Sequence, residues 1–94
     1  MRVVWTTPAS EDREQIVFFI AQANPQAALD MDNLFTCAAA SLITFPARGR
    51  HGRVSGTREL LVHKNYILVY SIDTEKGIVY IKAVLHAAQQ YPPK

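Results

Sequence analysis

Residues 48–73 read RGRHGRVSGTRELLVHKNYILVYSID, and after a short turn residues 78–92 read IVYIKAVLHAAQQYP. Three segments of this stretch have the apolar patterns of β-strands, at 54–62, 66–72 and 78–86. The middle segment is apolar on both faces, which is typical of a central strand. We therefore expect the second half of the chain to form a small sheet, with residues 73–77 as a hairpin loop.

Alternation along 78–86 assigns the side chains of this segment to two faces of the sheet. The expected core face carries the apolar residues Val79, Ile81, Ala83 and Leu85. The other face carries Tyr80, Lys82, Val84 and His86. Because this second set includes an aromatic, a cation and an imidazole, we expect it to be a functional surface.

The first half of the chain predicts a short strand at 2–6 and two helices. Thr7 is the expected N-cap of a helix over 8–23, and Asn24-Pro25 repeats the cap-and-proline signal for a second helix that Pro46 ends. The expected apolar stripes are Ile16, Phe19, Ile20 and Ala23 in the first helix, and Met31, Leu34, Phe35, Ala38, Leu42 and Phe45 in the second. The order strand, helix, helix, strand, strand, strand predicts an α+β fold over a single domain, 1–94. In this fold a twisted antiparallel sheet packs against a helical hairpin.

Charge is divided unevenly along the chain, although the net charge is only +2. Residues 1–47 carry two cations and five acids, whereas residues 48–94 carry eight cations and three acids. A basic face favours anionic partners, and cations in loops also keep a small domain in solution. Composition alone leaves both explanations open.

The sequence predicts a cytoplasmic protein without a metal or cofactor. Nothing resembles a signal peptide, and no apolar stretch approaches the ~18–20 residues that span a bilayer. The single cysteine, Cys37, excludes an internal disulfide framework and a cysteine-based zinc site, and it fits a reducing cytosol. The three histidines fall on different elements without the spacing of metal ligands.

Cations in the basic loop and the following strand are candidates for binding a target or nucleic acid. The loop holds Arg48, Arg50 and Arg53, whose guanidinium groups can bind phosphates in bidentate fashion. A solvated loop, or a dock for an acidic partner, explains these arginines equally well. Arg58 is the best single candidate, and an ion pair with Glu59 is the alternative for it.

The carboxy-terminal end supplies candidates for acid–base chemistry and base stacking. The His86 imidazole can act as a general acid or base, and Tyr91 can stack on a base. Lys82 could supply a further cation on the face of His86. The alternatives are a hydrogen-bonding histidine at a strand end and a tyrosine that pins the tail to the core. We expect the basic loop, His86 and Tyr91 to line one surface.

The segments RVSGTREL, NYILVYSI and VLHAAQQYP resemble the RelE/ParE superfamily of toxins from bacterial type II toxin–antitoxin modules. Its plasmid-stabilisation branch commonly reads GRVPGTREL, YxxVYRI and RVLHxxQxxP in this order, and the resemblance extends over 3–92. It implies the α+β fold above and a growth-inhibiting toxin. It also implies a cognate antitoxin, whose disordered C-terminal segment folds along the helical hairpin and the sheet to give a hetero-oligomer.

Three positions depart from the family patterns. Ser71 and Ala83 stand where the branch often has arginine, and Ile67 stands where ribosome-dependent RNases of the superfamily often have arginine. Such arginines stabilise the phosphate charge that develops as an RNA 2′-OH attacks, which these side chains cannot do. The departures favour the ParE-like branch, which inhibits DNA gyrase by binding.

Two alternatives to gyrase binding remain open. One is a RelE-like, ribosome-dependent mRNA endonuclease, with Arg58, Lys82, His86 and Tyr91 as its catalytic residues. The other is a decayed, non-toxic member that still binds the antitoxin.

Overall fold

The computed structural model describes residues 1–92 and has the α+β architecture that the sequence predicts. The elements are β1 (Arg2–Trp5), α1 (Thr7–Ala23), α2 (Pro25–Thr44), β2 (Arg50–His51), β3 (Arg58–His63), β4 (Tyr66–Asp73) and β5 (Ile78–His86). They form one sheet in the order β1-β5-β4-β3-β2, antiparallel except for the parallel pair β1 and β5. Neither helix of the described residues is long and apolar enough to cross a membrane.

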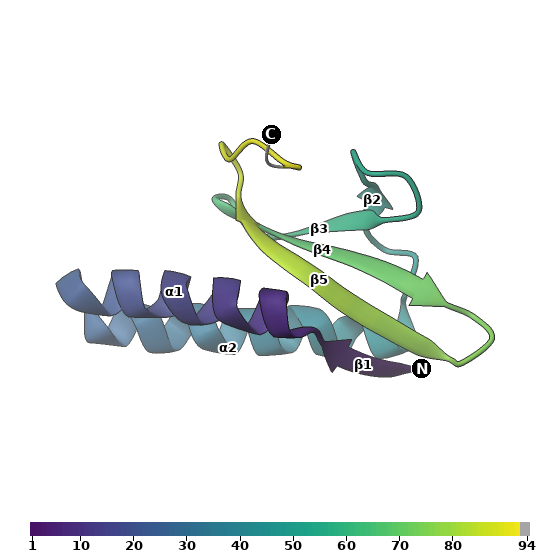
Figure 1. Ribbon diagram of the computed structural model, residues 1–94. Coiled ribbons are helices and arrows are strands. Elements are labelled where there is room, and N and C mark those ends of the chain that lie inside the picture. Colours follow the sequence, from purple (N-terminus) through teal and green to yellow (C-terminus); the bar gives the residue numbers. More distant parts are fainter. Residues whose placement is uncertain (93–94) are drawn as a thin grey trace.

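The sheet has two unlike faces. Figure 1 shows α1 and α2 side by side beneath one face, while the C-terminal segment crosses above the other. We call these the helix face and the open face. The hairpin of helices extends past the sheet at the end where α1 meets α2 (Figure 1).

The first helix begins at a residue that is also tied to the sheet. Thr6, not the predicted Thr7, is the N-cap: its Oγ1 accepts a hydrogen bond from the Ala9 N–H at 3.4 Å. The same hydroxyl donates to the Ile81 carbonyl at 2.6 Å. The predicted N-cap was one residue too late. Local cap rules could not identify Thr6, because its bond to Ile81 joins residues far apart in the sequence.

The predicted junction between the helices is confirmed. Asn24 ends α1 and caps α2, where its Oδ1 accepts from the Ala27 N–H at 3.1 Å. Arg13 then joins the two helices, because its Nε donates to the Asp32 carboxylate at 2.8 Å. The Arg13 guanidinium also lies 4.7 Å from the centre of the Trp5 ring, which suits a cation–π contact.

The main core lies between the helices and the sheet. Its buried members are Ala9, Met31, Phe35, Ala39, Leu42, Leu60, Leu68, Tyr70, Val79, Ile81 and Val84. The predicted stripes contribute Ile16 and Ile20 from α1, and Met31, Phe35 and Leu42 from α2. They are wrong at Phe19 and Phe45, which are 75% and 65% exposed, and Ala23 and Leu34 are exposed as well. A helical period identifies a face but not how far along the helix the sheet covers it.

The basic loop contains a strand that the sequence did not predict. The expected strand at 54–62 begins only at Arg58, because residues 54–57 form a turn. In that turn Gly56 has φ of +80°, and the Thr57 N–H donates to the Val54 carbonyl at 3.2 Å. The turn reverses the chain, so that the two-residue strand β2 pairs with the start of β3.

A β-bulge interrupts the pairing of β4 with β5. Val69 pairs with Ala83, but the next residue, Tyr70, pairs with Ile81, so Lys82 is an extra residue on β5. An extra residue shifts the two-residue alternation, and the side chains after it exchange faces.

The predicted division of β5 into a core face and a functional face is therefore wrong after Lys82. Val84 is buried in the main core, whereas Ala83 and Leu85 belong to a second apolar cluster on the open face. Asp12 on α1 accepts a hydrogen bond from the Val84 N–H at 3.1 Å. A helix side chain thus satisfies a backbone group next to the bulge.

Candidate functional site

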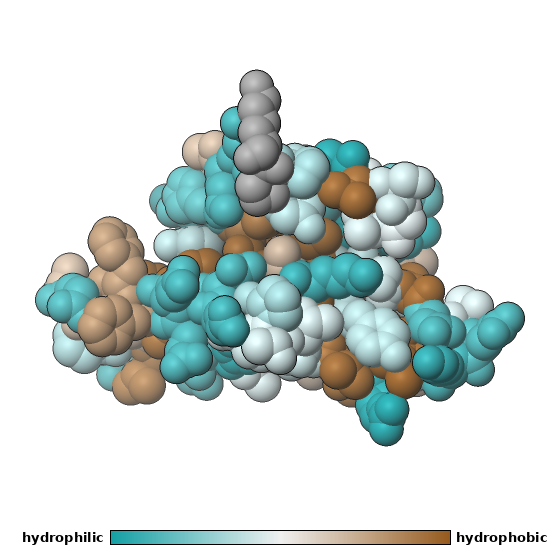
Figure 2. Space-filling view, in the orientation of Figure 1, coloured by the Kyte–Doolittle hydropathy of each residue, from teal (hydrophilic) through white to brown (hydrophobic). Residues whose placement is uncertain are grey.

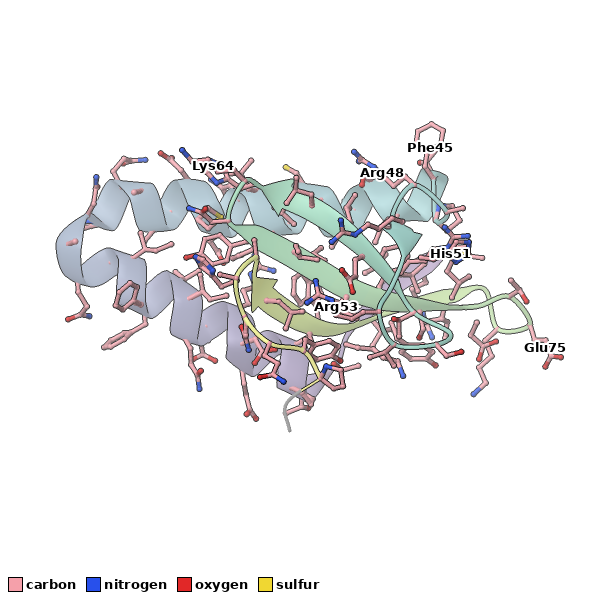
Figure 3. All side chains as sticks on the ribbon, turned by 90° about the horizontal axis from the view of Figure 1, so that it is seen from above. Phe45, Arg48, His51, Arg53, Lys64 and Glu75 are labelled. Carbon is pink, nitrogen blue, oxygen red and sulfur yellow. The ribbon has the colours of Figure 1, made fainter. Side chains whose placement is uncertain are left out.

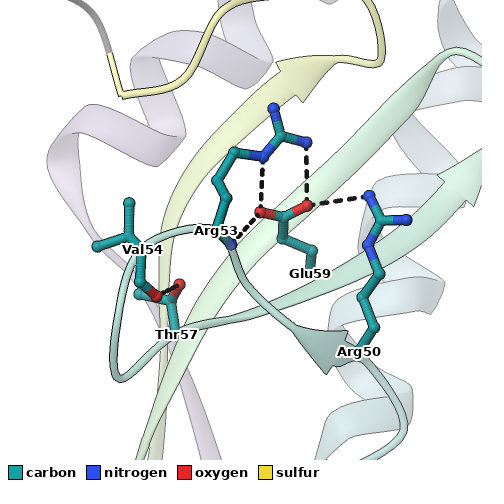
Figure 4. Close-up of polar contacts among 5 residues, drawn as sticks. All are labelled: Arg50, Arg53, Val54, Thr57 and Glu59. Atoms are coloured by element: carbon teal, nitrogen blue, oxygen red, sulfur yellow. Dashed lines mark hydrogen bonds and ion pairs between the residues drawn. The ribbon is translucent and has the colours of Figure 1, made fainter.

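The open face is organised around one buried acid, Glu59, which is 3% exposed. Its Oε2 accepts from the Arg53 Nε and backbone N–H, both at 3.0 Å, and its Oε1 accepts from the Arg53 Nη2 at 3.0 Å. Arg50 Nη2 donates to the same Oε1 at 3.1 Å. Figure 4 shows this group, which we call the Glu59 clamp: Glu59, Arg50 and Arg53.

The clamp holds Glu59 ionised. Burial of this carboxyl group by itself raises its pKa, but the side-chain and backbone hydrogen bonds from Arg53, and then the bond from Arg50, lower the pKa to about 2. The hydrogen bond to Glu59 in turn raises the pKa of Arg53. The carboxylate is thus charged at neutral pH, and it offsets part of the charge of both arginines.

Register and turn geometry explain why these residues meet. Arg50 on β2 is directly opposite Glu59 on β3, so their side chains share a face. The turn at residues 54–57 brings Arg53 back over the same spot, above the sheet in Figure 3. Of the predicted phosphate-binding arginines, Arg53 is therefore bonded to its own chain, whereas the Arg50 side chain donates one hydrogen bond and stays 68% exposed.

Tyr70, whose side chain lies on the helix face, anchors the start of the basic loop at Pro46 and Gly49. Its hydroxyl donates to the Pro46 carbonyl at 2.7 Å and accepts from the Gly49 N–H at 2.9 Å. A Cβ atom at Gly49 would lie 2.7 Å from that hydroxyl oxygen and 2.9 Å from the Glu59 carbonyl oxygen. Glycine is thus required here because the loop passes so close to β3 and β4.

Arg58 also contacts the basic loop, and it does not pair with Glu59. Its Nη1 donates to the Gly49 carbonyl at 2.8 Å and to the Ala47 carbonyl at 3.3 Å. Arg58 is opposite Tyr70 in the β3–β4 register, which places it on the helix face. Both of its contacts support the loop, and a role for Arg58 in binding a target stays a prediction.

The remaining cations of the predicted site, Arg48 and Lys82, are exposed. Arg48 donates to the Ser41 Oγ at 2.8 Å, and it is otherwise open to solvent. Lys82 is exposed at the bulge. Among residues 1–92 no cluster of three histidine, cysteine or acidic side chains could hold a metal ion.

The structure places His86 and Tyr91 on different faces. His86 lies opposite Tyr66 on the helix face; their rings meet edge to face at 5.6 Å, and the His86 Nδ1 accepts from the Ala88 N–H at 3.1 Å. Tyr91 packs on the open face, against the second apolar cluster formed by Ile67, Val69, Ala83 and Leu85.

The expectation of one common surface is thus only partly met. Arg50, Arg53 and Tyr91 share the open face, whereas Arg58 and His86 lie on the helix face. Arg58 and His86 are paired with β4 residues four positions apart, which is about 13 Å along a strand.

Sequence reasoning treated Glu59 only as a possible partner of Arg58, and it missed Asp12. A signal for Glu59 was present, because it is the only acid between Asp32 and Asp73 in a segment rich in arginine. A glutamate is almost never fully buried unless it is paired, and this segment offers many cations to pair with. No comparable signal marked Asp12, since its partner is a backbone group 72 positions away.

Comparisons with known proteins point to one family. A sequence model described as the ParE toxin of the type II toxin-antitoxin system, parDE, matches residues 3–91. Y4kP from Sinorhizobium fredii, which is named as a toxin, is 37% identical over 92 residues, or 97% of this chain and 93% of that protein. Toxin RelE2 from Caulobacter vibrioides is 38% identical over 88 residues, or 94% of this chain and 97% of that protein.

Solved structures share the fold. A chain of the chromosomal ParDE TA system from P. aeruginosa matches with a TM-score of 0.79 at 20% identity, over 92% of this chain and 95% of that one. A chain of the toxin-antitoxin complex RelBE2 from Mycobacterium tuberculosis matches with a TM-score of 0.62 at 27% identity, over 90% and 95% of the two chains.

Proposed function

Because this chain belongs to the ParE toxin family of type II toxin–antitoxin systems, we propose that it arrests growth by binding DNA gyrase. A cognate antitoxin neutralises it in the cytoplasm. The action is binding to the target, without cleavage of RNA.

The Glu59 clamp carries this proposal. Cleavage of RNA needs cationic groups directed at the phosphate charge that develops in the transition state. Two of the predicted arginines, Arg50 and Arg53, instead donate to Glu59, and Arg58 donates to loop carbonyls. Because Arg53, Arg58 and in part Arg50 are engaged by the protein's own groups, we favour recognition of a folded protein over stabilisation of a transition state.

The placement of the carboxy-terminal pair supports the same conclusion. A general acid or base has to lie within hydrogen-bonding reach of the reacting group, about 2.6–3.2 Å. His86 and Tyr91 lie on opposite faces of the sheet, which argues against their acting together on one phosphodiester. Family patterns often have arginine at three further positions. Here these positions hold Ile67, Ser71 and Ala83, which cannot supply a cation to stabilise the phosphate charge.

The exposed end of the helical hairpin supports an antitoxin partner. Phe18, Phe19 and Leu29 are exposed there, and Figure 2 shows hydrophobic residues at the end of the hairpin that extends past the sheet. Large exposed apolar side chains that gather in one place mark surfaces that a partner covers. An antitoxin segment that folds on binding would cover them.

The relative Toxin RelE2 favours the second candidate, a ribosome-dependent mRNA endonuclease, because the identity of 38% extends over nearly the whole chain. In that case Arg58, Lys82, His86 and Tyr91 would have to gather around the RNA when it binds. The ribosome would then have to rearrange the C-terminal segment.

One experiment separates these functions. The protein is expressed alone and together with the product of the adjoining open reading frame, and growth, DNA damage signalling and mRNA integrity are followed. We expect growth arrest, an SOS response, and inhibition of supercoiling when purified gyrase is mixed with the toxin. The co-expressed antitoxin should restore growth. Cleaved mRNA with intact DNA would establish the endonuclease instead, and the absence of any phenotype would indicate a decayed member.

A further inference from the structure

A hollow lies between α1 and the end of β5, on the helix face of the sheet, whereas the Glu59 clamp lies on the open face. Figure 1 shows the end of β5 above α1 at this place. The hollow has a volume of about 380 Å³, and its walls come from α1 on one side and from β4, β5 and the segment after β5 on the other. Pockets of about 300–1,000 Å³ that combine apolar walls with a few polar groups are typical of small-molecule sites.

Aromatic side chains supply much of the wall. Phe19, which the helical stripe predicts to be in the core, is exposed and lines this hollow instead. Tyr66 lines it as well, and its ring is held edge to face by Phe35 at 5.9 Å and by His86 at 5.6 Å between ring centres. An exposed phenylalanine beside a ring that is fixed in place offers a surface on which a planar ligand can stack.

Asp12 offers a hydrogen-bond acceptor to the same hollow. One of its oxygens, Oδ2, accepts from the Val84 N–H at 3.1 Å. The other oxygen, Oδ1, has no hydrogen-bond partner within residues 1–92. Because a carboxylate accepts through both oxygens, the bond to Val84 holds the group in place and leaves Oδ1 for a ligand.

The segment after β5 fixes two donors at the hollow. The His86 Nδ1 accepts from the Ala88 N–H at 3.1 Å, so the neutral imidazole carries its proton on Nε2, which is a donor. The Gln89 Oε1 accepts from the His86 N–H at 3.2 Å, which leaves the amide Nε2 of Gln89 as a second donor. Both side chains line the hollow, which thus combines an acceptor and two donors with aromatic rings.

We propose that this hollow binds a nucleobase. Adenine presents an exocyclic amine, a donor, next to a ring nitrogen that accepts. The amine would donate to Asp12, the ring nitrogen would accept from His86 or Gln89, and the ring would stack on Phe19. A free nucleoside and an unpaired base of a single strand share this chemistry. The inference goes beyond the proposed function and does not depend on it.

The polar groups argue against a protein side chain as the occupant. A guanidinium or ammonium group carries donors only, so it would suit Asp12 but oppose the N–H groups of His86 and Gln89. A carboxylate carries acceptors only and would oppose Asp12. A side-chain amide carries both kinds of group but has no ring to stack on Phe19. The edge and the face of a nucleobase match the polar and the aromatic groups together.

A pair of nucleosides tests the site on the full chain. Binding is followed by ¹⁵N NMR during titration with adenosine, and with purine riboside, which has the same ring system but lacks the amine. Adenosine should shift the amide resonances of residues 12–19 and 84–89 until they saturate. Purine riboside should bind about tenfold more weakly, because Asp12 then meets no donor.

A hexamer of adenosine nucleotides distinguishes the two sources of the base. If the hexamer shifts the same resonances and binds more tightly than adenosine, the ligand is an unpaired strand. If it binds equally or more weakly, the ligand is a free nucleoside. Either result supports the inference, provided that adenosine itself binds.

An alanine pair on α1 tests the stacking surface. Phe19→Ala should weaken adenosine binding by about tenfold, because the base loses the ring on which it stacks. Phe18→Ala is the matched control, since Phe18 is exposed at the next position but lines other hollows. Both side chains are exposed, so folding should be unaffected.

Asp12→Asn tests the acceptor. The new amide can keep its oxygen on the Val84 N–H and present its NH₂ group to the hollow, so the preference for adenosine over purine riboside should disappear. Glu11→Gln, at the neighbouring exposed position, should keep the preference. The preference is a ratio of two affinities, so a variant that is only less stable would leave it unchanged.

The outcomes separate this inference from the proposed function. It is overturned if adenosine shifts none of these resonances, if both nucleosides bind equally to the wild type, or if the two alanine variants behave alike. A partner protein that shifts these resonances where adenosine does not would make the hollow a protein contact and overturn the nucleobase site. Growth arrest through gyrase without adenosine binding would leave the proposed function standing alone. Adenosine binding without growth arrest would leave the nucleobase site standing alone.

Discussion

Asp12 on α1 accepts a hydrogen bond from the Val84 N–H at 3.1 Å, across 72 positions of sequence. Val84 follows the bulge at Lys82, where the β4–β5 ladder shifts by one residue. The contact joins α1 to the end of β5, where the bulge has exchanged the faces on which the side chains lie. It therefore supports the arrangement that buries Val84 and turns Ala83 and Leu85 toward the open face.

Asp12→Ala should lower the free energy of unfolding by about 1–2 kcal/mol, because the Val84 N–H loses its acceptor. Asp12→Asn should recover part of the loss, since an amide oxygen can still accept the bond. Urea denaturation measures the change. Glu11→Ala removes a neighbouring exposed acid and is the control, which should cost little. Equal effects of the two alanine variants would show that the bond to Val84 does not matter.

The depressed pKa of Glu59 predicts a loss of stability in acid. The folded-state pKa is about 2, against an ordinary value of 4.5, so the stabilisation is fully present above about pH 4.5 and is lost as pH falls toward 2. At neutral pH this corresponds to about 3 kcal/mol. The difference in unfolding free energy between wild type and Glu59→Gln should therefore be large at pH 7 and shrink below pH 4.5.

Glu75→Gln is the matched control for Glu59, because Glu75 is exposed in the β4–β5 hairpin. Denaturant titrations at several pH values between 7 and 2 compare the three proteins. A difference between wild type and Glu59→Gln that stays constant over this range would contradict the lowered pKa.

Tyr70→Phe should destabilise the protein by about 1–3 kcal/mol, because it leaves the Gly49 N–H and the Pro46 carbonyl without their shared partner. Tyr80→Phe, on the neighbouring strand, removes a hydroxyl from a half-buried ring and serves as the control. Thermal or urea unfolding measures both. Amide exchange at Gly49 should also accelerate in Tyr70→Phe, and unchanged exchange there would argue against the bond.

His86→Ala and Tyr91→Phe should leave growth arrest within about twofold of wild type if the protein acts by binding gyrase, since neither change removes a reacting group. Tyr91→Phe keeps the ring that packs on the open face. Loss of a general acid or base typically costs about 10²–10⁴-fold in rate. A drop of that size in mRNA cleavage, with folding intact, would support the endonuclease.

Local patterns in the sequence were sufficient for the family and for the order of elements, except for the two-residue strand β2. Asn24-Pro25 predicted the junction of the two helices, and the apolar run at 66–72 predicted the central strand, because caps, prolines and apolar periods act over a few residues. The motifs in the second half pointed to RelE/ParE toxins, and the family match over residues 3–91 confirms this.

Which side chains meet was decided by the tertiary structure. One extra residue, Lys82, exchanged the faces of the side chains that follow it on β5. The turn at residues 54–57 placed Arg53 and Arg50, and not Arg58, within hydrogen-bonding distance of Glu59. The alternation of a strand fixes its faces only while the register holds, and the register depends on partner strands and on helix groups such as Asp12. The sequence by itself determined the family and every element except β2, while pairing between distant segments determined the surface that these elements present.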